Sequence, residues 1–307
     1  METTLIAYDG SECSEAIITE LKHAGLPAQF KAHVVAVAEV WATSAVNPAA
    51  ETEAWADLPP AAFENEQLRR EEAVEEAGAL AMQGAARLRT AFPDWLVEGV
   101  GYADSPAHAI VQRAREVSAD LIFIGSHSRS AIVRFFLGSV SQKVAAEAKC
   151  SVHICRPRAL SGAAPRLLVA VDGSLPSQAA VRAVAARSWP AGTVVAAVTV
   201  IEPRAQAADT TREFSREWLR QRDGALVWLE AVCIAAQRQL ELAGLATERH
   251  TLEGEPKSRL LEYAASWNAD CLFIGASGLH HPATETLGTV ALALAVRAHC
   301  SVEIVRP

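Results

Sequence analysis

The sequence is poor in several features, and each shortage excludes a class of protein. Only 6% of its 307 residues are aromatic, and 28 Lys and Arg residues are outnumbered by 36 Asp and Glu residues. A net charge of −8 argues against nucleic-acid binding, which requires clustered cations to neutralise phosphates. The longest apolar runs, such as residues 193–201, fall far short of the roughly 20 residues that cross a bilayer, and Met1 to Gly10 lack the pattern of a secretory signal. We therefore predict a cytoplasmic protein that binds neither nucleic acid nor membrane.

Familiar catalytic and metal-binding patterns are also missing. The sequence has no G-x-x-x-x-G-K-[ST] phosphate loop and no G-x-G-x-x-G after its first apolar run. Its 6 cysteines form no C-x-x-C pair, and no Cys/His cluster has the spacing of metal ligands. We expect the cysteines to be core residues and assign no catalytic residue and no metal site. Any hydrolysis of a bound nucleotide would be slow, because no general base is identified.

What the sequence does contain is a long internal repeat. Residues 119–125 (ADLIFIG) recur as 269–275 (ADCLFIG), and residues 150–157 (CSVHICRP) recur as 300–307 (CSVEIVRP), both at an offset of 150. Residues 7–11 (AYDGS) recur as 170–174 (AVDGS) at an offset of 163, so the first copy is 13 residues longer in its middle. We predict two domains, residues 1–157 and 165–307, joined by a linker at 158–164.

Within each copy, short apolar runs alternate with segments of helical composition. Residues 33–40 and 194–201 have the continuous Val-rich character of buried strands, whereas residues 68–89 and 218–242 are rich in Ala, Glu, Arg and Leu. This alternation predicts parallel strands joined by crossover helices, hence two tandem open doubly wound α/β sheets flanked by helices. Residues 41–66 are predicted to form a surface excursion before the long helix of the first copy.

Polar turns follow the strands where an open sheet binds its ligands. Asp9-Gly10-Ser11 follows the first strand, a glycine-containing turn begins at Gly125, and Gly138-Ser139-Val140 opens a helix. A helix that begins at Gly-Ser or Gly-Thr offers free backbone N–H groups, a hydroxyl and the positive end of the helix dipole, which together suit a phosphate. The aspartate can accept hydrogen bonds from ribose hydroxyls.

These residues resemble the universal stress protein family in its tandem two-domain form, over essentially the whole chain. The pattern is Gly-x-x-Gly, nine residues, then Gly-[Ser/Thr]-Val; the second copy matches it completely, whereas the first has Ser128 at the second glycine. The resemblance implies five-stranded sheets of order 3-2-1-4-5, as in the adenine nucleotide alpha-hydrolase-like fold, and ATP or a related nucleotide as ligand, with or without Mg²⁺. It also implies that Val40 and Val200 contact the adenine and that Asp9 and Asp172 bind the ribose.

The candidate nucleotide-binding residues come from both copies. In the first copy they are Ala7, Asp9, Val40, Gly125, His127, Ser128, Arg129, Gly138, Ser139, Val140 and Ser141. In the second copy they are Asp172, Val200, Gly275, Gly278, Gly288, Thr289 and Val290.

We favour the first copy as the tighter site. Its loop carries Arg129 and Arg134, whereas the loop of the second copy has no Lys or Arg. Charge-assisted contacts of roughly 1.5–3 kcal/mol each outweigh a cost of about 1 kcal/mol for Ser128, if that position requires a positive φ.

Three functions remain open at this point. The favoured one is an ATP-binding regulatory protein of the stress response, and the alternatives are an interaction scaffold with empty pockets and a slow ATPase. By the same resemblance, the terminal strands at 151–155 and 301–305 pair with one another within the chain. A homodimer and a protein partner are left open. We expect Trp218, Trp228 and Leu229 to be packing residues of a long helix.

Overall fold

The computed structural model describes residues 2–40, 60–126, 137–157, 164–202, 212–279 and 287–307. We call residues 2–157 the first half and residues 164–307 the second half. In the first half the elements are β1 (Thr3–Ala7), α1 (Glu12–Leu21), β2 (Lys31–Glu39), α2 (Pro60–Ala91), β3 (Leu96–Asp104), α3 (Pro106–Glu116), β4 (Leu121–Gly125), α4 (Ser139–Glu147) and β5 (Ser151–Cys155). In the second half they are β6 (Arg166–Ala170), α5 (Leu175–Ala185), β7 (Val194–Ile201), α6 (Arg212–Leu242), β8 (Ala246–Glu253), α7 (Pro256–Ser266), β9 (Cys271–Gly275), α8 (Thr289–Arg297) and β10 (Ser301–Val305).

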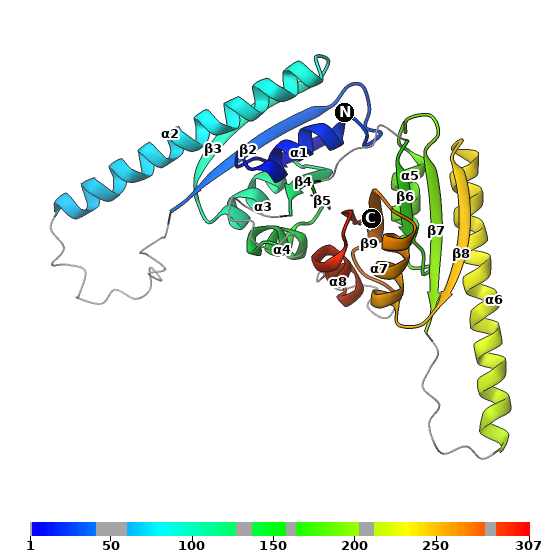
Figure 1. Cartoon of the computed structure of the whole chain (residues 1–307). Helices are drawn as coiled ribbons and strands as arrows, with labels where there is room; N and C mark the ends of the chain where they lie inside the picture. The colour runs from blue at the N-terminus through cyan, green and yellow to red at the C-terminus, as the bar shows by residue number, and fades with distance from the viewer. Residues whose placement is uncertain (1, 41–59, 127–136, 158–163, 203–211, 280–286) are drawn as a thin grey trace, which may run out of the picture.

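All ten strands belong to one continuous sheet (Figure 1). Their order is β3-β2-β1-β4-β5-β10-β9-β6-β7-β8, so each half has the predicted 3-2-1-4-5 order. The strands within each half are parallel, whereas β5 and β10 are antiparallel at the centre of the sheet. The expected pairing of the two terminal strands within one chain is therefore confirmed.

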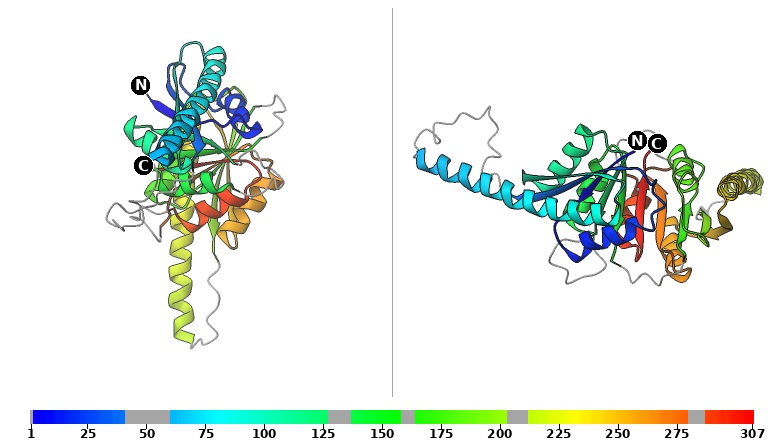
Figure 2. Two further views of the ribbon diagram at one scale, coloured as in Figure 1. Left: turned by 90° about the vertical axis from the view of Figure 1, so that its left-hand side faces the viewer. Right: turned by 90° about the horizontal axis from the view of Figure 1, so that it is seen from above.

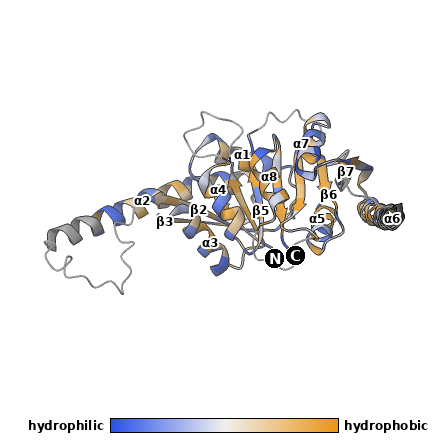
Figure 3. Cartoon of the chain, turned by 90° about the horizontal axis from the view of Figure 1, so that it is seen from below, coloured by the Kyte–Doolittle hydropathy of each residue, from blue (hydrophilic) through white to orange (hydrophobic). Residues whose placement is uncertain are grey.

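The two faces of the sheet are covered differently. On one face, α3, α4, α7 and α8 bury a single hydrophobic core that runs through both halves, including Val152 and Val302 at the centre. On the other face, α1 and α2 bury one core in the first half, and α5 and α6 bury a separate core in the second half. Hydrophobic residues are concentrated on the strands between these layers, and hydrophilic residues lie mainly on the helices (Figure 3).

The apolar runs recognised in the sequence all form strands, but the third strand of each half was not recognised. β3 has Gly99 and Gly101 among partly exposed residues, and β8 has the polar sequence ATERHTLE with no fully buried position. Both lie at the edges of the sheet, where burial is incomplete and a continuous apolar run is not required.

The long helices α2 and α6 have 32 and 31 residues, and both extend beyond the sheet (Figure 2). The expected excursion at 41–66 is corrected in its last part, because α2 already begins at Pro60, while residues 41–59 lie outside the described part of the chain. Five of the six cysteines are buried, and Cys150 is partly buried, in agreement with their expected place in the core. In the described residues, no helix is long and apolar enough to span a membrane.

Candidate functional site

A cavity of about 470 Å³ lies at the carboxyl ends of β6, β7 and β9. The strand order of the second half reverses at this point. From β6 the chain proceeds outward to β7 and β8 on one side, and it then returns to the other side of β6 to form β9 and β10. Ligands of open α/β sheets bind at such switch points, and the volume is in the range of small-molecule sites. All seven candidate residues of the second half line the cavity: Asp172, Val200, Gly275, Gly278, Gly288, Thr289 and Val290.

Asp172 ties together the two turns on one side of the cavity. One carboxylate oxygen accepts hydrogen bonds from the backbone N–H of Ser174 at 2.9 Å and from its hydroxyl at 2.6 Å. The other oxygen accepts from the backbone N–H of Leu279 at 3.3 Å. The N-cap of α5 is Ser174, whose side chain accepts from the N–H of Ser177, so Asp172 is not itself a helix cap.

Glycine is favoured at position 278 by this close approach and not by its backbone conformation. A Cβ at this position would lie 2.7 Å from an oxygen of Asp172. Gly278 is not among the described glycines with positive φ, which include Gly10 and Gly173. The condition under which Ser128 would be strained, a positive φ at the second glycine, is therefore not met at the equivalent position of the second half.

The first turn of α8 forms the opposite side of the cavity. Gly288 donates its N–H to the carbonyl of Ala276 at 2.7 Å and is the N-cap of the helix, without a side-chain capping bond. The backbone N–H groups of the first turn have no acceptor within the helix and carry the positive end of its dipole. Thr289 and Val290 of this turn line the cavity.

Two charged residues at the start of α7, Glu255 and Lys257, line the cavity and were missed in the sequence. Lys257 Nζ lies 3.9 Å from Glu255 Oε1. Glu255 accepts a hydrogen bond from the backbone N–H of Ser258 at 2.8 Å, and hydrogen bonding with Ser258 lowers the pKa of its carboxyl, so it is ionised at neutral pH. At an offset of 150, Lys257 corresponds to buried Ala107 in the first half. Extending the repeat to the start of this helix would have identified Lys257.

The long helix α6 reaches the cavity through Leu229, which lines it, and Trp228, which covers the turn at Gly173. A Cβ on Gly173 would lie 2.3 Å from the Trp228 ring, and Gly173 has φ +84°. The packing role expected for Trp228 is thus found at the edge of the site, with 44% of the residue exposed. The side chain of Trp218 lies outside the part of the protein that the structure describes.

The first half packs its long helix more closely. A Cβ at Gly101 of β3 would lie 2.1 Å from the backbone nitrogen of Gly78 in α2. The equivalent position of the third strand in the second half is Thr251, so the second half has a threonine where the first half has this glycine.

The described candidates of the first half lie in the equivalent turns. Ala7 ends β1, and Gly125 ends β4. Asp9 accepts from the N–H of Ser11 at 3.0 Å. Gly138 is the N-cap of α4, which begins at Ser139 and continues through Val140 and Ser141.

Two expectations for the first half change. The hydroxyl of Ser141 donates to the carbonyl of Gly125 at 2.6 Å and is buried, so it is not an additional donor for a phosphate. Val40 lies one residue beyond β2 and is partly exposed. Strand pairing sets Val35 beside Ala7 and Val198 beside Ala170, so Val37 is the structural equivalent of Val200. His127, Ser128, Arg129 and Arg134 lie outside the described residues, and the preference for the first half as the tighter site stays a prediction.

Known proteins resemble the chain over both halves. The model of the universal stress protein family matches residues 1–156 and 164–306. A universal stress protein of Thermus aquaticus, encoded in the 3′ region of a QAH/OAS sulfhydrylase gene, is 34% identical over 157 residues, covering 50% of this chain and 98% of that protein. A universal stress protein structure from Archaeoglobus fulgidus covers 99% of this chain and 96% of its own, with a TM-score of 0.58 at 17% identity. A universal stress protein solved in complex with cAMP covers 47% of this chain and 98% of its own, with 26% identity and a TM-score of 0.33.

Proposed function

Because this chain belongs to the universal stress protein family, we propose that it is a regulatory stress-response protein whose second-half cavity binds an adenine nucleotide. The observation that carries the proposal is the convergence of an aspartate, two glycine turns and a helix N-terminus on one cavity of suitable volume. No catalytic role is assigned to the residues of this cavity.

Each wall of the cavity suits a different part of a nucleotide. Val198, Val200 and Leu260 supply apolar surface for a base. In this proposal Asp172 accepts hydrogen bonds from ribose hydroxyls, and the carboxylate oxygen that contacts Leu279 supports this role because, among the described residues, it has a single, long hydrogen bond of 3.3 Å. The first turn of α8 supplies backbone N–H groups for a phosphate, because its N-cap, Gly288, has no side chain that caps them.

The charge of the lining favours a nucleotide accompanied by a cation. Asp172, Glu202 and Glu255 line the cavity together with Lys257. These three carboxylates exceed the one ammonium group, so the lining would repel a free triphosphate. Mg²⁺ binds phosphate oxygens and neutralises part of their charge. We therefore propose ATP with Mg²⁺ as the ligand and Lys257 as the group that contacts its phosphates.

Lys257→Ala, which introduces the residue found at this position in the first half, tests that role. A charge-assisted hydrogen bond contributes roughly 1.5–3 kcal/mol, so the Kd for ATP with Mg²⁺ should rise about 10- to 100-fold. The Kd for adenosine should stay within about a factor of two. Isothermal titration calorimetry with both ligands measures the difference. Equal weakening of ATP and adenosine would show that Lys257 acts on the fold of the pocket and not on the phosphates.

Asp172→Asn tests the proposed function itself. The amide keeps an oxygen for Ser174 but loses the charge, so binding of ATP with Mg²⁺ in the second half should weaken by about 10-fold or more. Asp9→Asn makes the same change in the first half and should leave the second-half site unaltered. Calorimetry on both full-length variants measures the effect. No binding by the wild-type chain, with no rise in its melting temperature in millimolar ATP with Mg²⁺, would instead support a scaffold with empty pockets.

A further inference from the structure

The contact between the two halves is centred on a single pair of residues. In the antiparallel pairing of β5 with β10, Val302 lies opposite Ile154, Glu303 opposite His153 and Ile304 opposite Val152. At the repeat offset of 150, His153 and Glu303 occupy the same position in the two copies. A pseudo-twofold axis therefore passes between these two side chains.

The interactions on either side of this axis are nearly symmetric. The backbone N–H of Arg156 donates to the hydroxyl of Ser301 at 3.0 Å, and the N–H of Arg306 donates to the hydroxyl of Ser151 at 3.1 Å. Each arginine side chain also crosses to the other half, Arg156 to the carbonyl of Cys300 at 3.1 Å and Arg306 to that of Cys150 at 3.2 Å. Because they are symmetric, these contacts would serve two like halves as well as two unlike halves.

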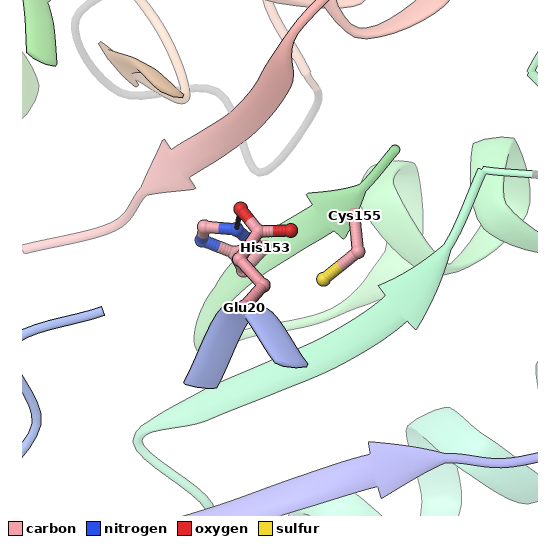
Figure 4. A group of neighbouring side chains, drawn as sticks. All are labelled: Glu20, His153 and Cys155. Atoms are coloured by element: carbon pink, nitrogen blue, oxygen red, sulfur yellow. Dashed lines mark hydrogen bonds and ion pairs between the residues drawn. The ribbon is translucent and has the colours of Figure 1, made fainter. Parts of the chain in front are cut away.

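The pair on the axis is not symmetric. His153 Nδ1 lies 2.8 Å from Glu303 Oε2. On the other side of the ring, His153 Nε2 lies 2.9 Å from Glu20 Oε1 of α1 (Figure 4). Glu303 accepts from Arg187 at 2.9 Å in a two-pronged ion pair. His153 and Glu303 are 2% and 1% exposed. At the offset of 163, Glu20 corresponds to Ala183 and Arg187 to Ala24, so neither charge is duplicated in the other half.

Two like halves could not form this buried contact. Two copies of ionised Glu303 would offer only acceptors to one another. Two copies of His153, each hydrogen-bonded through Nε2 to its own Glu20, would present identical Nδ1 atoms, both donors or both acceptors. Like charges that face one another at an interface cost several kcal/mol, which is how interfaces exclude wrong partners.

We propose that His153 and Glu303, oriented by Glu20 and Arg187, form a pairing key that joins a first half to a second half and rejects the pairing of like halves. The key favours pairing of the two halves within one chain, in which the edges of β5 and β10 cover one another. Its partner is a surface that presents an acidic side chain at the centre of an antiparallel edge strand.

The same cluster contains a set of atoms that could hold a metal ion, since one ligand atom each from Glu20, His153 and Cys155 lies within 4.8 Å of the others (Figure 4). Both ring nitrogens of His153 are, however, hydrogen-bonded to carboxylates. Burial raises the pKa of the Cys155 thiol well above its usual range, which keeps the thiol protonated. The contacts thus favour an ion-pair network, and Cys155→Ser becomes a control that separates the two interpretations.

Mixing two full-length variants tests the key. In His153→Glu the axis holds two carboxylates, and in Glu303→His it holds two imidazoles. Across two chains, the unchanged His153 and Glu20 of one variant can meet the unchanged Glu303 and Arg187 of the other. We expect the mixture to form a 1:1 complex at least about tenfold in excess of the self-complex of either variant, the factor that corresponds to 1.4 kcal/mol. A mixture of wild-type chains carrying two different tags should show no such excess of the mixed complex over the self-complexes.

Native mass spectrometry, with the two variants carrying tags of different mass, distinguishes the mixed complex from each self-complex. Cys155→Ser should leave the wild-type pairing unchanged. If the two folded variants form no mixed complex, or if wild-type chains associate as readily, the proposal is overturned. If either variant is insoluble alone, the two are co-expressed; a soluble 1:1 complex formed only on co-expression supports the key, and its absence overturns it. Disruption by Cys155→Ser equal to that of the charge variants would also overturn it, in favour of a metal site.

Discussion

Replacing Glu303 by alanine is expected to lower the free energy of unfolding by about 3–5 kcal/mol, because it removes one member of a buried ion pair and leaves the others uncompensated. Glu303 is 1% exposed and contacts both His153 and Arg187. Its loss also opens a space between the separate α1/α2 and α5/α6 cores of that face. Urea denaturation followed by circular dichroism measures the change.

A surface ion pair supplies the control for this substitution. Arg259 lies 2.6 Å from Glu262, and both side chains are at least 42% exposed. Exposed pairs contribute less than about 1 kcal/mol, so Glu262→Ala should have little effect. Similar losses for Glu262→Ala and Glu303→Ala would show that the central network is not an important source of stability.

The network also predicts how stability depends on pH. Burial opposes the charged form of His153, but Glu20 and Glu303 raise its pKa to about 9, from 6.5. Its contribution is therefore complete below pH 6.5 and is lost as the pH rises through 9. Burial likewise opposes ionisation of Glu303, but Arg187 and His153 lower its pKa to about 2, from 4.5, so that its contribution is present above pH 4.5 and lost as the pH falls through 2.

These two limits define a window between about pH 4.5 and 6.5 in which the wild type should exceed Glu303→Gln in stability by the largest margin. The neighbouring thiols of Cys155 and Cys271 do not alter this, because burial raises the pKa of both well above their usual range. Urea titrations of both proteins at pH 5.5, 7 and 9 measure the margin. A margin that grows from pH 5.5 to 9 would contradict the assignment of a charged His153.

Gly278→Val is expected to weaken nucleotide binding in the second half by more than about 100-fold, equivalent to about 2.7 kcal/mol. Even a Cβ at Gly278 would lie 2.7 Å from an oxygen of Asp172, and the branched side chain would extend into the space beside it. Gly278→Ser, which copies the residue at 128 of the first half, should cause a smaller loss. Calorimetry with ATP and Mg²⁺ measures both.

Gly224→Ala is the matched control for these glycine variants. A Cβ at Gly224 meets nothing within 4 Å, and the residue lies in α6. Gly224→Ala should leave the Kd unchanged. The melting temperatures of all three variants should stay within a few degrees of the wild-type value. If Gly278→Val binds nucleotide like the wild type, the cavity beside Asp172 is not the binding site.

Most of the architecture could be predicted from the sequence because it rests on local patterns. The Asp-Gly-Ser turns, the continuous apolar runs of the inner strands and the repeated ends at residues 150–157 and 300–307 each have a direct physical meaning. The edge strands β3 and β8 escaped recognition because they are buried incompletely, so their composition resembles that of loops.

The parts of the site that were missed depend on distances across the fold or on following the repeat beyond its repeated motifs into the helix starts and the second strand. Lys257 comes from a helix whose start has no glycine motif, and Trp228 reaches the site because α6 contacts the turn at Gly173. Val37 could have been identified in place of Val40 by keeping the offset of 163 through the second strand. The network at the centre of the sheet was invisible to any local pattern, because His153 and Glu303 are 150 residues apart.

A crystal structure of the full-length chain grown in millimolar ATP and Mg²⁺ tests the central claim most directly. The account predicts electron density for an adenine nucleotide between Asp172 and the first turn of α8, with the base against Val198 and Val200 and a phosphate at the N–H groups of residues 289–291. An empty second-half cavity at that ligand concentration, or nucleotide bound only elsewhere on the chain, would contradict it.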